Sequence, residues 1–440
     1  MRSVRRITRF TLGALLLAAA ARGQGVPASL TMQYVDERAG MTLDAAIARA
    51  REREPSLRAV RADLDVARGM RQQAGLRPNP TLTVERREEP TGTDHQTSVG
   101  VQWPLDLFRR SARVQTADRV LQASEFAASD RERLLVASVR LQYGVAAAAV
   151  RDTVVAAELV TTAQRQLDLV RARVDTGGAP PLERDLLEVE LRRFEAQRLL
   201  AAGRVDAAFV QLKQLLGMSP DEPLLLREAL ETLVTGTTGG AATPGRAPSM
   251  AARSDVREAD ARVQVADARI DQARREGRAD VSLYGTYMRM DAGFPQQGFG
   301  AAGTIVRVRG QFNYVAGGAM VALPLFNRNQ GQVAAAQAER SGAEARRAAT
   351  ELAVRAEVGM AQARDTAARR AVALYTSGVR VLARRNLDVV RQTFELGRAT
   401  VYDVLTEQRR YLDIEQAYTA ALREAWEAHA DLQRALGDRP

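Results

Sequence analysis

Two long stretches of this chain contain no proline, Leu105 to Ala179 and Leu325 to Arg439. Both are rich in Ala, Leu, Arg, Glu and Gln, which lose little side-chain entropy in a helix. Each stretch is interrupted by glycine, at Gly177-Gly178 and at Gly397. Since a helix rises about 1.5 Å per residue, a helix from Arg110 to Val174 extends roughly 100 Å. The sequence therefore predicts paired helices far longer than a globular domain needs.

The N-terminus has the order of a secretory signal peptide. Arginines at positions 2, 5, 6 and 9 precede the apolar run Phe10–Ala21, and small residues follow it. This run is too short to cross a bilayer. We therefore expect residues 1–23 to be a signal peptide, with a buried N-terminal helix as the alternative. No later segment reaches about 18 uninterrupted apolar residues, so no transmembrane helix is expected.

Composition excludes several classes of chemistry. The chain has no cysteine, which rules out disulfides, thiol catalysis and cysteine metal sites. Its two histidines, His95 and His429, are far apart in sequence, and His429 falls on a helical seam where packing is expected rather than metal binding. No nucleophile–base set, Walker loop or dinucleotide fingerprint occurs. We therefore predict no catalytic, cofactor or metal site, and no enzyme.

The formal net charge is +10, carried almost wholly by arginine. Acidic residues are interspersed with the arginines along the predicted helices, a pattern typical of solvated, paired helix faces. Nucleic acid is therefore not an expected partner.

The chain repeats itself. Leu57 aligns with Val256, Pro104-Leu105 with Pro324-Leu325, and Gly177 with Gly397. The order of features is the same in both halves: helix, strand pair, proline, long helix, glycine turn, helix. The predicted divisions are residues 24–216 for the first repeat, 217–253 for an irregular connector and 254–437 for the second repeat.

Each repeat contains a pair of alternating segments. Residues 81–88 and 96–105 in the first, and 280–290 and 311–323 in the second, show the period of two that is typical of strands. The strand regions are thus expected at about 79–105 and 280–324, with a Gly-rich loop at 293–310. Strands of about ten residues cross a bilayer when tilted. Two equivalent pairs behind a signal peptide favour membrane strands over soluble hairpins.

Four strands cannot close a membrane barrel, because small barrels need at least eight. An open sheet edge cannot face lipid, because its amides would lack partners. Several copies must therefore share one barrel: two copies give eight strands and three give twelve. Long helices continuing from the strands would form a water-filled tube, which indicates transport.

The chain resembles the TolC-like outer-membrane efflux protein family, nearest to the channel components of resistance-nodulation-division pumps. The residues that carry the resemblance are 43–50 (LDAAIARA), 77–80 (RPNP), 324–328 (PLFNR), 394–397 (FELG) and 403–405 (DVL). The resemblance covers essentially the whole mature chain.

This resemblance implies a mainly α fold with a small membrane β-barrel contribution. Duplicated long α-helical hairpins would form a trimeric α-barrel, and four β-strands per protomer would join a shared twelve-stranded barrel. It also implies a homotrimer in the cell outer membrane, in contact with its lipid, with the helical part in the periplasm. The expected partners are a periplasmic adaptor protein and an inner-membrane pump. The alternatives are a type I secretion channel, a periplasmic adaptor and a structural coiled coil.

The resemblance also assigns a gate. An aspartate shortly after the second turn glycine lines the narrow periplasmic entrance in the family, and the matching residue is Asp403. A second acidic position of the family is Thr406 here, with Glu407 beside it. Asp403 and Glu407 are therefore the gate candidates. The alternative for Asp403 is a helix cap, because Thr400-Val401-Tyr402-Asp403 fits a capping box.

Four residues at the turns between long helices are candidate adaptor contacts, as the family implies: Gly177, Gly178, Gly397 and Arg398. The alternative for Gly177 and Gly397 is conformational, because glycine readily supplies the left-handed residue after a helix.

Overall fold

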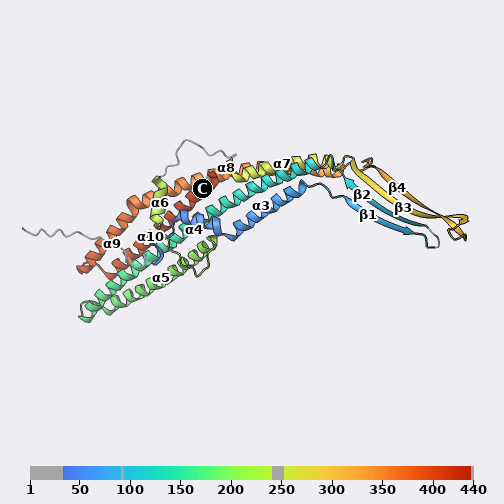
Figure 1. Ribbon diagram of the computed structural model, residues 1–440. Coiled ribbons are helices and arrows are strands. Elements are labelled where there is room, and N and C mark those ends of the chain that lie inside the picture. The colour runs from blue at the N-terminus through green and yellow to red at the C-terminus, as the bar shows by residue number, and fades with distance from the viewer. Residues whose placement is uncertain (1–32, 91–93, 240–251, 438–440) are drawn as a thin grey trace, which may run out of the picture.

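The computed structural model describes residues 33–90, 94–239 and 252–437, and the predicted signal peptide lies outside these ranges. The molecule is an elongated bundle of helices with a ribbon of strands at one end (Figure 1). Its longest helix, α4 (Arg110–Asp175), has 66 residues, or about 100 Å at 1.5 Å per residue. The prediction of very long helices from the proline-free stretches is confirmed.

The first half of the described chain has two helices, two strands and two long helices. They are α2 (Leu43–Arg53), α3 (Pro55–Ala74), β1 (Thr81–Glu88), β2 (His95–Pro104), α4 and α5 (Pro181–Leu215). α3 ends shortly before Pro78 and Pro80, whose nitrogens cannot donate a helical hydrogen bond. Pro181 begins α5, where a missing amide hydrogen is tolerated.

The second half repeats this order after the short helix α6 (Leu230–Gly239). Its elements are α7 (Ser254–Glu276), β3 (Asp280–Phe299), β4 (Ile305–Ala322), α8 (Gln330–Leu374), η2 (Tyr375–Val379), α9 (Arg380–Glu395) and α10 (Val401–Leu436). η2 is a π-helical turn that interrupts what the sequence predicted as one continuous helix.

The prediction of a loop at residues 293–310 is wrong. β3 continues to Phe299 and β4 begins at Ile305, so only a short turn separates them. Pairing continues through the glycines, with a register shift between Gly293 and Gln297. The physical reason is that a ladder is made by backbone groups, which glycine supplies as well as any residue. The alternation of Ile, Val and Arg at 305–309 is a strand signal that the flanking glycines obscure.

The four strands form one antiparallel sheet in the order β1-β2-β3-β4, so β2 and β3 join the two halves of the chain. The register places Leu82 opposite Val101, Val99 opposite Tyr287, and Tyr287 opposite Val315. These side chains share one face of the sheet and are exposed, Val315 at 87%. Within the described residues, the half of this face nearest the helices is thus an uncovered apolar surface.

The long helices below the sheet lie side by side in the order α5, α4, α10, α9. Leu167 of α4, Phe194 of α5, Leu387 of α9 and Tyr411 of α10 belong to one buried cluster in the lower part of this layer. Seams of this kind bury an apolar stripe of each helix against its neighbours. α5 and α9 form the two edges of the layer.

A compact segment packs against the middle of α4, and we call it the collar (residues 33–53 and 224–236). The hydroxyl of Tyr143 on α4 donates to the carbonyl of Met41 at 2.8 Å. Arg151, two turns further along α4, pairs with Glu231 of α6. Ala147, between them, lies in the same buried cluster as the collar. One face of α4 is therefore dedicated to holding the collar.

Gly144 of α4 lies directly against the side chain of Trp426 on α10. A Cβ atom built at Gly144 would lie 1.9 Å from Cδ1 of Trp426. The ring nitrogen of Trp426 donates to the carbonyl of Arg140 at 2.8 Å. Glycine is thus needed here because the indole occupies the space of any larger side chain.

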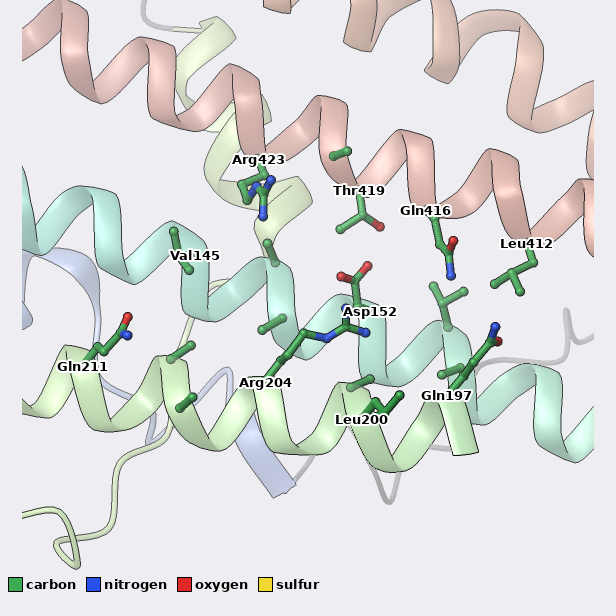
Figure 2. A pocket seen from close by; sticks show the side chains of 18 residues that line it. Val145, Asp152, Gln197, Leu200, Arg204, Gln211, Leu412, Gln416, Thr419 and Arg423 are labelled. Atoms are coloured by element: carbon green, nitrogen blue, oxygen red, sulfur yellow. The ribbon is translucent and has the colours of Figure 1, made fainter. Parts of the chain in front are cut away.

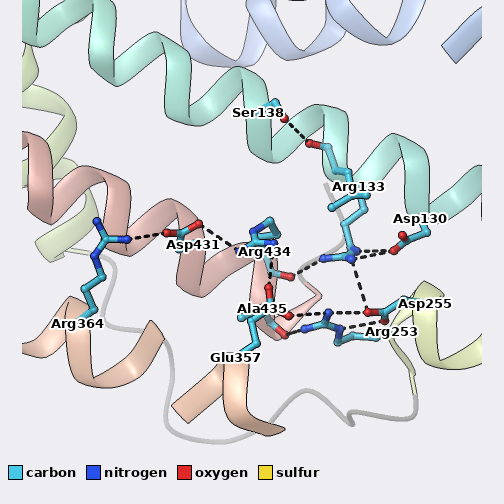
Figure 3. A network of polar contacts seen from close by, with 11 residues as sticks. Asp130, Arg133, Ser138, Arg253, Asp255, Glu357, Arg364, Asp431, Arg434 and Ala435 are labelled. Carbon is cyan, nitrogen blue, oxygen red and sulfur yellow. Dashed lines mark hydrogen bonds and ion pairs between the residues drawn. The ribbon is translucent and has the colours of Figure 1, made fainter. Parts of the chain in front are cut away.

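A network of arginines joins four helices where α7 begins and α10 ends (Figure 3). Arg253, just before α7, donates to Glu357 of α8 at 3.0 Å and to the carbonyl of Ala435 on α10. Arg133 of α4 donates to the carbonyl of Arg434 at 2.8 Å. The side chain of Arg253 is only 3% exposed, so its buried positive charge depends on these partners for stabilisation. The network fixes the C-terminal helix against both repeats.

Candidate functional site at the helical tip

The free end of the helical layer consists of two turns, one between α4 and α5 and one between α9 and α10 (Figure 1). Gly177 and Gly397 occupy equivalent positions in them, each with φ of +73°. The amide of Gly178 donates to the carbonyl of Arg173 at 2.7 Å, and that of Arg398 to Thr393 at 2.9 Å. Both turns therefore have the Schellman geometry that closes a helix with a left-handed glycine.

All four predicted contact residues lie at this tip and are exposed. A Cβ atom built at Gly177 or Gly397 would meet nothing within 4 Å. The reason for glycine at both positions is therefore the positive φ rather than a lack of space. The conformational alternative accounts for the two glycines, and the adaptor contact stays a prediction.

Arg173 joins the two turns, a role that sequence reasoning missed. Its guanidinium donates to the carbonyl of Glu395 at 2.9 Å and lies 5.2 Å from the ring centre of Phe394. The last carbonyls of a helix lack partners and carry negative charge, so a guanidinium there is favourable. The only signal in the sequence is a basic residue in the last turn of α4.

Asp403 caps α10. Its carboxylate accepts from the amide of Thr400 at 2.9 Å and from the Thr400 hydroxyl at 2.7 Å, and its own amide donates back to that hydroxyl at 3.2 Å. These hydrogen bonds from Thr400, the side chain first and then the amide, lower the pKa of Asp403. The predicted capping box is present, and the carboxylate is charged and exposed.

Glu407 lies four residues further along α10, on the same face as Asp403. It is half-buried, and one of its carboxylate oxygens is buried without a hydrogen-bond partner within the described chain. The other oxygen lies 4.0 Å from Arg410. The structure thus brings the two gate candidates onto one face.

A bridge closes the layer just above the tip. Arg409 of α10 donates to both oxygens of Glu190 on α5, at 3.2 and 3.0 Å. Beneath it, Gln408 donates to Gln166 of α4 at 2.5 Å, and both side chains are buried. The carboxylate of Glu190 is only 3% exposed. These contacts hold α5 and α10 together across α4.

Above this bridge a groove opens between α4, α5 and α10 (Figure 2). It encloses about 670 Å³. Asp152 of α4 lies at its centre, with Arg204 of α5 and Arg423 of α10 on the two walls. Burial raises the pKa of Asp152, while Thr419 and the nearby arginines act in the opposite direction.

Two further observations limit the chemistry that the described residues can support. In the parts of the chain that the structure describes, no three His, Asp or Glu side chains gather where they could hold a metal ion. His429 is largely buried; Arg369 lies 2.9 Å from one ring nitrogen and Gln433 3.0 Å from the other. Burial lowers the pKa of His429.

No described helix combines the length and the apolar character needed to cross a membrane.

The chain is a duplicated helical layer with its own four-stranded sheet, and comparison with known proteins gives the class to which it belongs. The family model "Outer membrane efflux protein" matches residues 46–218 and 249–438. The chain belongs to this family of efflux channels.

Two relatives and one structure illustrate the similarity. The cobalt-zinc-cadmium resistance protein CzcC of Cupriavidus metallidurans is 23% identical over 415 residues, covering 93% of each chain. The nickel and cobalt resistance protein CnrC of the same organism is 24% identical over 281 residues, 62% of this chain and 61% of CnrC. The crystal structure of CusC superposes with a TM-score of 0.71 at 18% identity, covering 92% of this chain and 93% of CusC.

The predicted family and fold are therefore confirmed. Family membership decides against the two alternatives of a periplasmic adaptor and a structural coiled coil.

Proposed function

We propose that this protein is the exit duct of a tripartite efflux system. Three copies form a ring in the cell outer membrane and passively conduct cargo delivered by a periplasmic adaptor and an inner-membrane pump. The observation that carries this proposal is that both edges of the helical layer present exposed apolar seams, which a sister subunit would cover.

The first seam lies on α5. Exposed residues recur there at intervals of three and four, and eight of the nine are apolar or glycine: Leu182, Leu186, Val189, Arg193, Ala196, Leu200, Gly203, Ala207 and Val210. Leu182, Val189 and Leu200 are 66%, 69% and 70% exposed. Such spacing is that of a coiled-coil seam. No described element covers it.

The second seam lies on the opposite edge, at the end of α8 and along α9. Leu374, Val381, Leu382, Val389 and Leu396 are exposed, between 53% and 73%. α5 leads away from the tip and α9 leads towards it, so the two seams run antiparallel. A seam on one copy that fits a different seam on the next copy gives a head-to-tail contact, and such contacts close into rings.

The sheet requires the same closure. β1 and β4 are its unpaired edges, and its exposed apolar face suits contact with lipid hydrocarbon. Three copies supply twelve strands. Two copies supply eight, the smallest number that closes a barrel. We favour three because the family resemblance implies a trimer.

The tip is proposed as the gate and the docking end. Three copies of Asp403 around one axis would concentrate negative potential in the entrance, with Glu407 behind them. Gly177, Gly178, Gly397 and Arg398 would be offered to the adaptor. The duct has no enzymatic role in this proposal, and the pump chooses the cargo. A type I secretion channel is the second candidate, because one duct can serve both systems.

Cysteine pairs test the ring, because the chain has no cysteine of its own. Val189 lies near the start of α5 and Val389 near the end of α9, at similar height above the tip. The variant with both Val189→Cys and Val389→Cys should form disulfide-linked trimers in outer-membrane fractions, seen on non-reducing gels. The matched control pairs Val189→Cys with Leu374→Cys, about four helical turns higher, which should not cross-link.

Unboiled gels of the unmodified protein give the second readout, and a stable trimer in the outer-membrane fraction is expected. A monomeric protein in the soluble periplasmic fraction, with neither cysteine pair forming links between chains, would rule the proposal out.

A further inference from the structure

The groove between α4, α5 and α10 has no role in the proposed function. Its volume of about 670 Å³ falls in the range of small-molecule sites, which is roughly 300–1,000 Å³. Ala148, Ala156 and Leu412 give it an apolar lining, and three glutamine amides stand at its walls. This combination of an apolar bed and a few polar groups is typical of sites that hold organic molecules.

The groove and the collar lie on opposite faces of the helical layer. Tyr143 of α4 faces the collar, since its hydroxyl donates to the carbonyl of Met41, whereas Val145 lines the groove. Residues two positions apart point to nearly opposite sides of a helix, since each residue turns by about 100°. α4 therefore separates the two features.

The groove lies on the concave side of the layer. Leu200 and Ala207 belong both to the α5 seam and to the groove lining. A sister helix seated on that seam must therefore approach from the groove side, which curves the layer towards the groove. The ring then has the groove on its inner wall and the collar outside. This step rests on the proposed function.

The charges in the groove favour an anion. Arg204 extends from α5 towards Asp152, and Arg423 points in from α10 (Figure 2). Arg423 also lies 3.6 Å from Glu427 on its own helix. Glu427 is not a lining residue. Among the lining residues, two guanidinium groups face one half-buried carboxylate, so the lining has a positive balance and offers paired donors. Guanidinium groups bind carboxylate and sulfonate oxygens well, whereas a metal cation would be repelled.

We infer that the groove is a binding site in the channel wall for organic anions of drug size. The ligand class is a molecule with a carboxylate or sulfonate group, which Arg204 and Arg423 bind, and an apolar body that lies on the alanines and Leu412. A ring of three copies holds three such sites, and each delays and concentrates anionic cargo along the duct.

The charge of the groove can be tested by placing a cysteine in it and measuring how fast charged reagents react there. Ala420 is an exposed lining residue on α10. The variant Ala420→Cys, as the assembled protein, is reacted with an anionic sulfonatoethyl and a cationic trimethylammonioethyl thiosulfonate. The rate of each reagent with the protein is divided by the rate of the same reagent with a small free thiol in solution. The anionic reagent should react at least about tenfold faster, since a charged cleft raises the local concentration of counter-ions by that order.

Two arginine substitutions test the assignment. Adding Arg204→Gln and Arg423→Gln to Ala420→Cys should abolish the preference for the anionic reagent. Adding Arg192→Gln, which alters an exposed arginine elsewhere on α5, should leave the preference unchanged. Fluorescein should protect Ala420→Cys from a neutral thiol reagent, and the cation rhodamine 6G should not. Modification should also lower single-channel conductance, which checks the luminal placement.

Equal normalised rates, a faster cationic reagent, or an anion preference that survives loss of both arginines would overturn the inference. The same samples are run unboiled on gels. If no trimer forms, the proposed function fails. If trimers form but the groove shows no preference, only this inference fails.

Discussion

The guanidinium of Arg151 on α4 donates to the carboxylate of Glu415 on α10 at 2.7 Å, and the two side chains are 9% and 3% exposed. Arg380, the first residue of α9 after the π-helical turn, donates to the other oxygen of Glu415 at 2.7 Å. Tyr418 lies against both guanidinium groups, with its ring centre 4.8 and 4.5 Å from their central carbons. One buried carboxylate thus connects three helices where α8 gives way to α9.

Replacing Glu415 should be strongly destabilising. Glu415→Gln removes the countercharge of Arg380 and one of the two carboxylates that Arg151 contacts, the other being Glu231. Breaking a buried pair costs roughly 3–5 kcal/mol. The expected result is a lower denaturant midpoint, which is measured by circular dichroism of the purified protein in detergent. The control is Glu424→Gln, which removes an exposed partner of Arg364 and should change the midpoint little. Equal midpoints for the two variants would contradict this role of Glu415.

The same carboxylate predicts a pH dependence. Burial alone would raise the pKa of Glu415, but the hydrogen bonds and charges of Arg380 and Arg151 outweigh it and hold the pKa below its ordinary value of 4.5. A lowered pKa contributes stability that is complete above pH 4.5 and is lost as the pH falls through the folded-state value. The difference in unfolding free energy between wild type and Glu415→Gln should therefore be large at pH 7 and shrink in acid. A difference independent of pH would argue against it.

Gly144 should not tolerate a side chain. Gly144→Ala places a methyl group where the Trp426 indole lies, so α4 and α10 must separate, at a cost of about 1–3 kcal/mol. Thermal unfolding should show the loss. Gly69→Ala is the matched control, because a Cβ atom at Gly69 of α3 meets nothing within 4 Å. That variant should be neutral or slightly more stable, since alanine favours the helix.

The two roles considered for Asp403, gate and helix cap, can be tested separately. Asp403→Asn keeps an acceptor for the helix cap but removes the charge, so it should reduce the cation selectivity of single channels while the melting temperature changes little. Thr400→Ala weakens the cap but keeps the carboxylate, so it should lower the melting temperature and leave selectivity intact. Unchanged selectivity in Asp403→Asn would leave Asp403 as a cap alone.

The Arg409–Glu190 bridge predicts a looser tip when it is removed. Arg409→Gln takes the paired donors from a carboxylate that is 3% exposed and removes this contact between α10 and α5. Single-channel conductance in planar bilayers should rise. Arg192→Gln alters an exposed arginine on α5 and should leave conductance near that of the wild type. Identical conductance in the two variants would show that this bridge does not restrain the tip.

Local rules account for most of the architecture. The absence of proline predicts α4, the glycines at 177 and 397 predict both tip turns, and Thr400 with Asp403 predicts the cap of α10. The turn and cap signals each depend on residues within about one helical turn of each other. The extension of β3 and β4 was missed because the glycines near the turn obscure the alternation.

Long-range features could not be predicted from the sequence. Glu415 and Arg151 are separated by 264 positions, and nothing in either neighbourhood identifies the other. The groove is built from three helices, so its charges have meaning only after α4, α5 and α10 are packed. The π-helical turn has no distinctive residue pattern that we recognise. The two gate candidates and the adaptor contacts remain predictions for the same reason, since they depend on other subunits.

The two hairpins of the sheet differ in length. β3 has 20 residues and β4 has 18, whereas β1 has 8 and β2 has 10. At about 3.4 Å per residue, the second hairpin is roughly twice as tall as the first, and about ten residues suffice for a bilayer crossing. In the proposed ring of three copies, three longer hairpins would extend beyond the shorter ones, at the end of the molecule away from the helices. In the proposed outer-membrane orientation, a molecule approaching the cell from outside would meet these longer hairpins first.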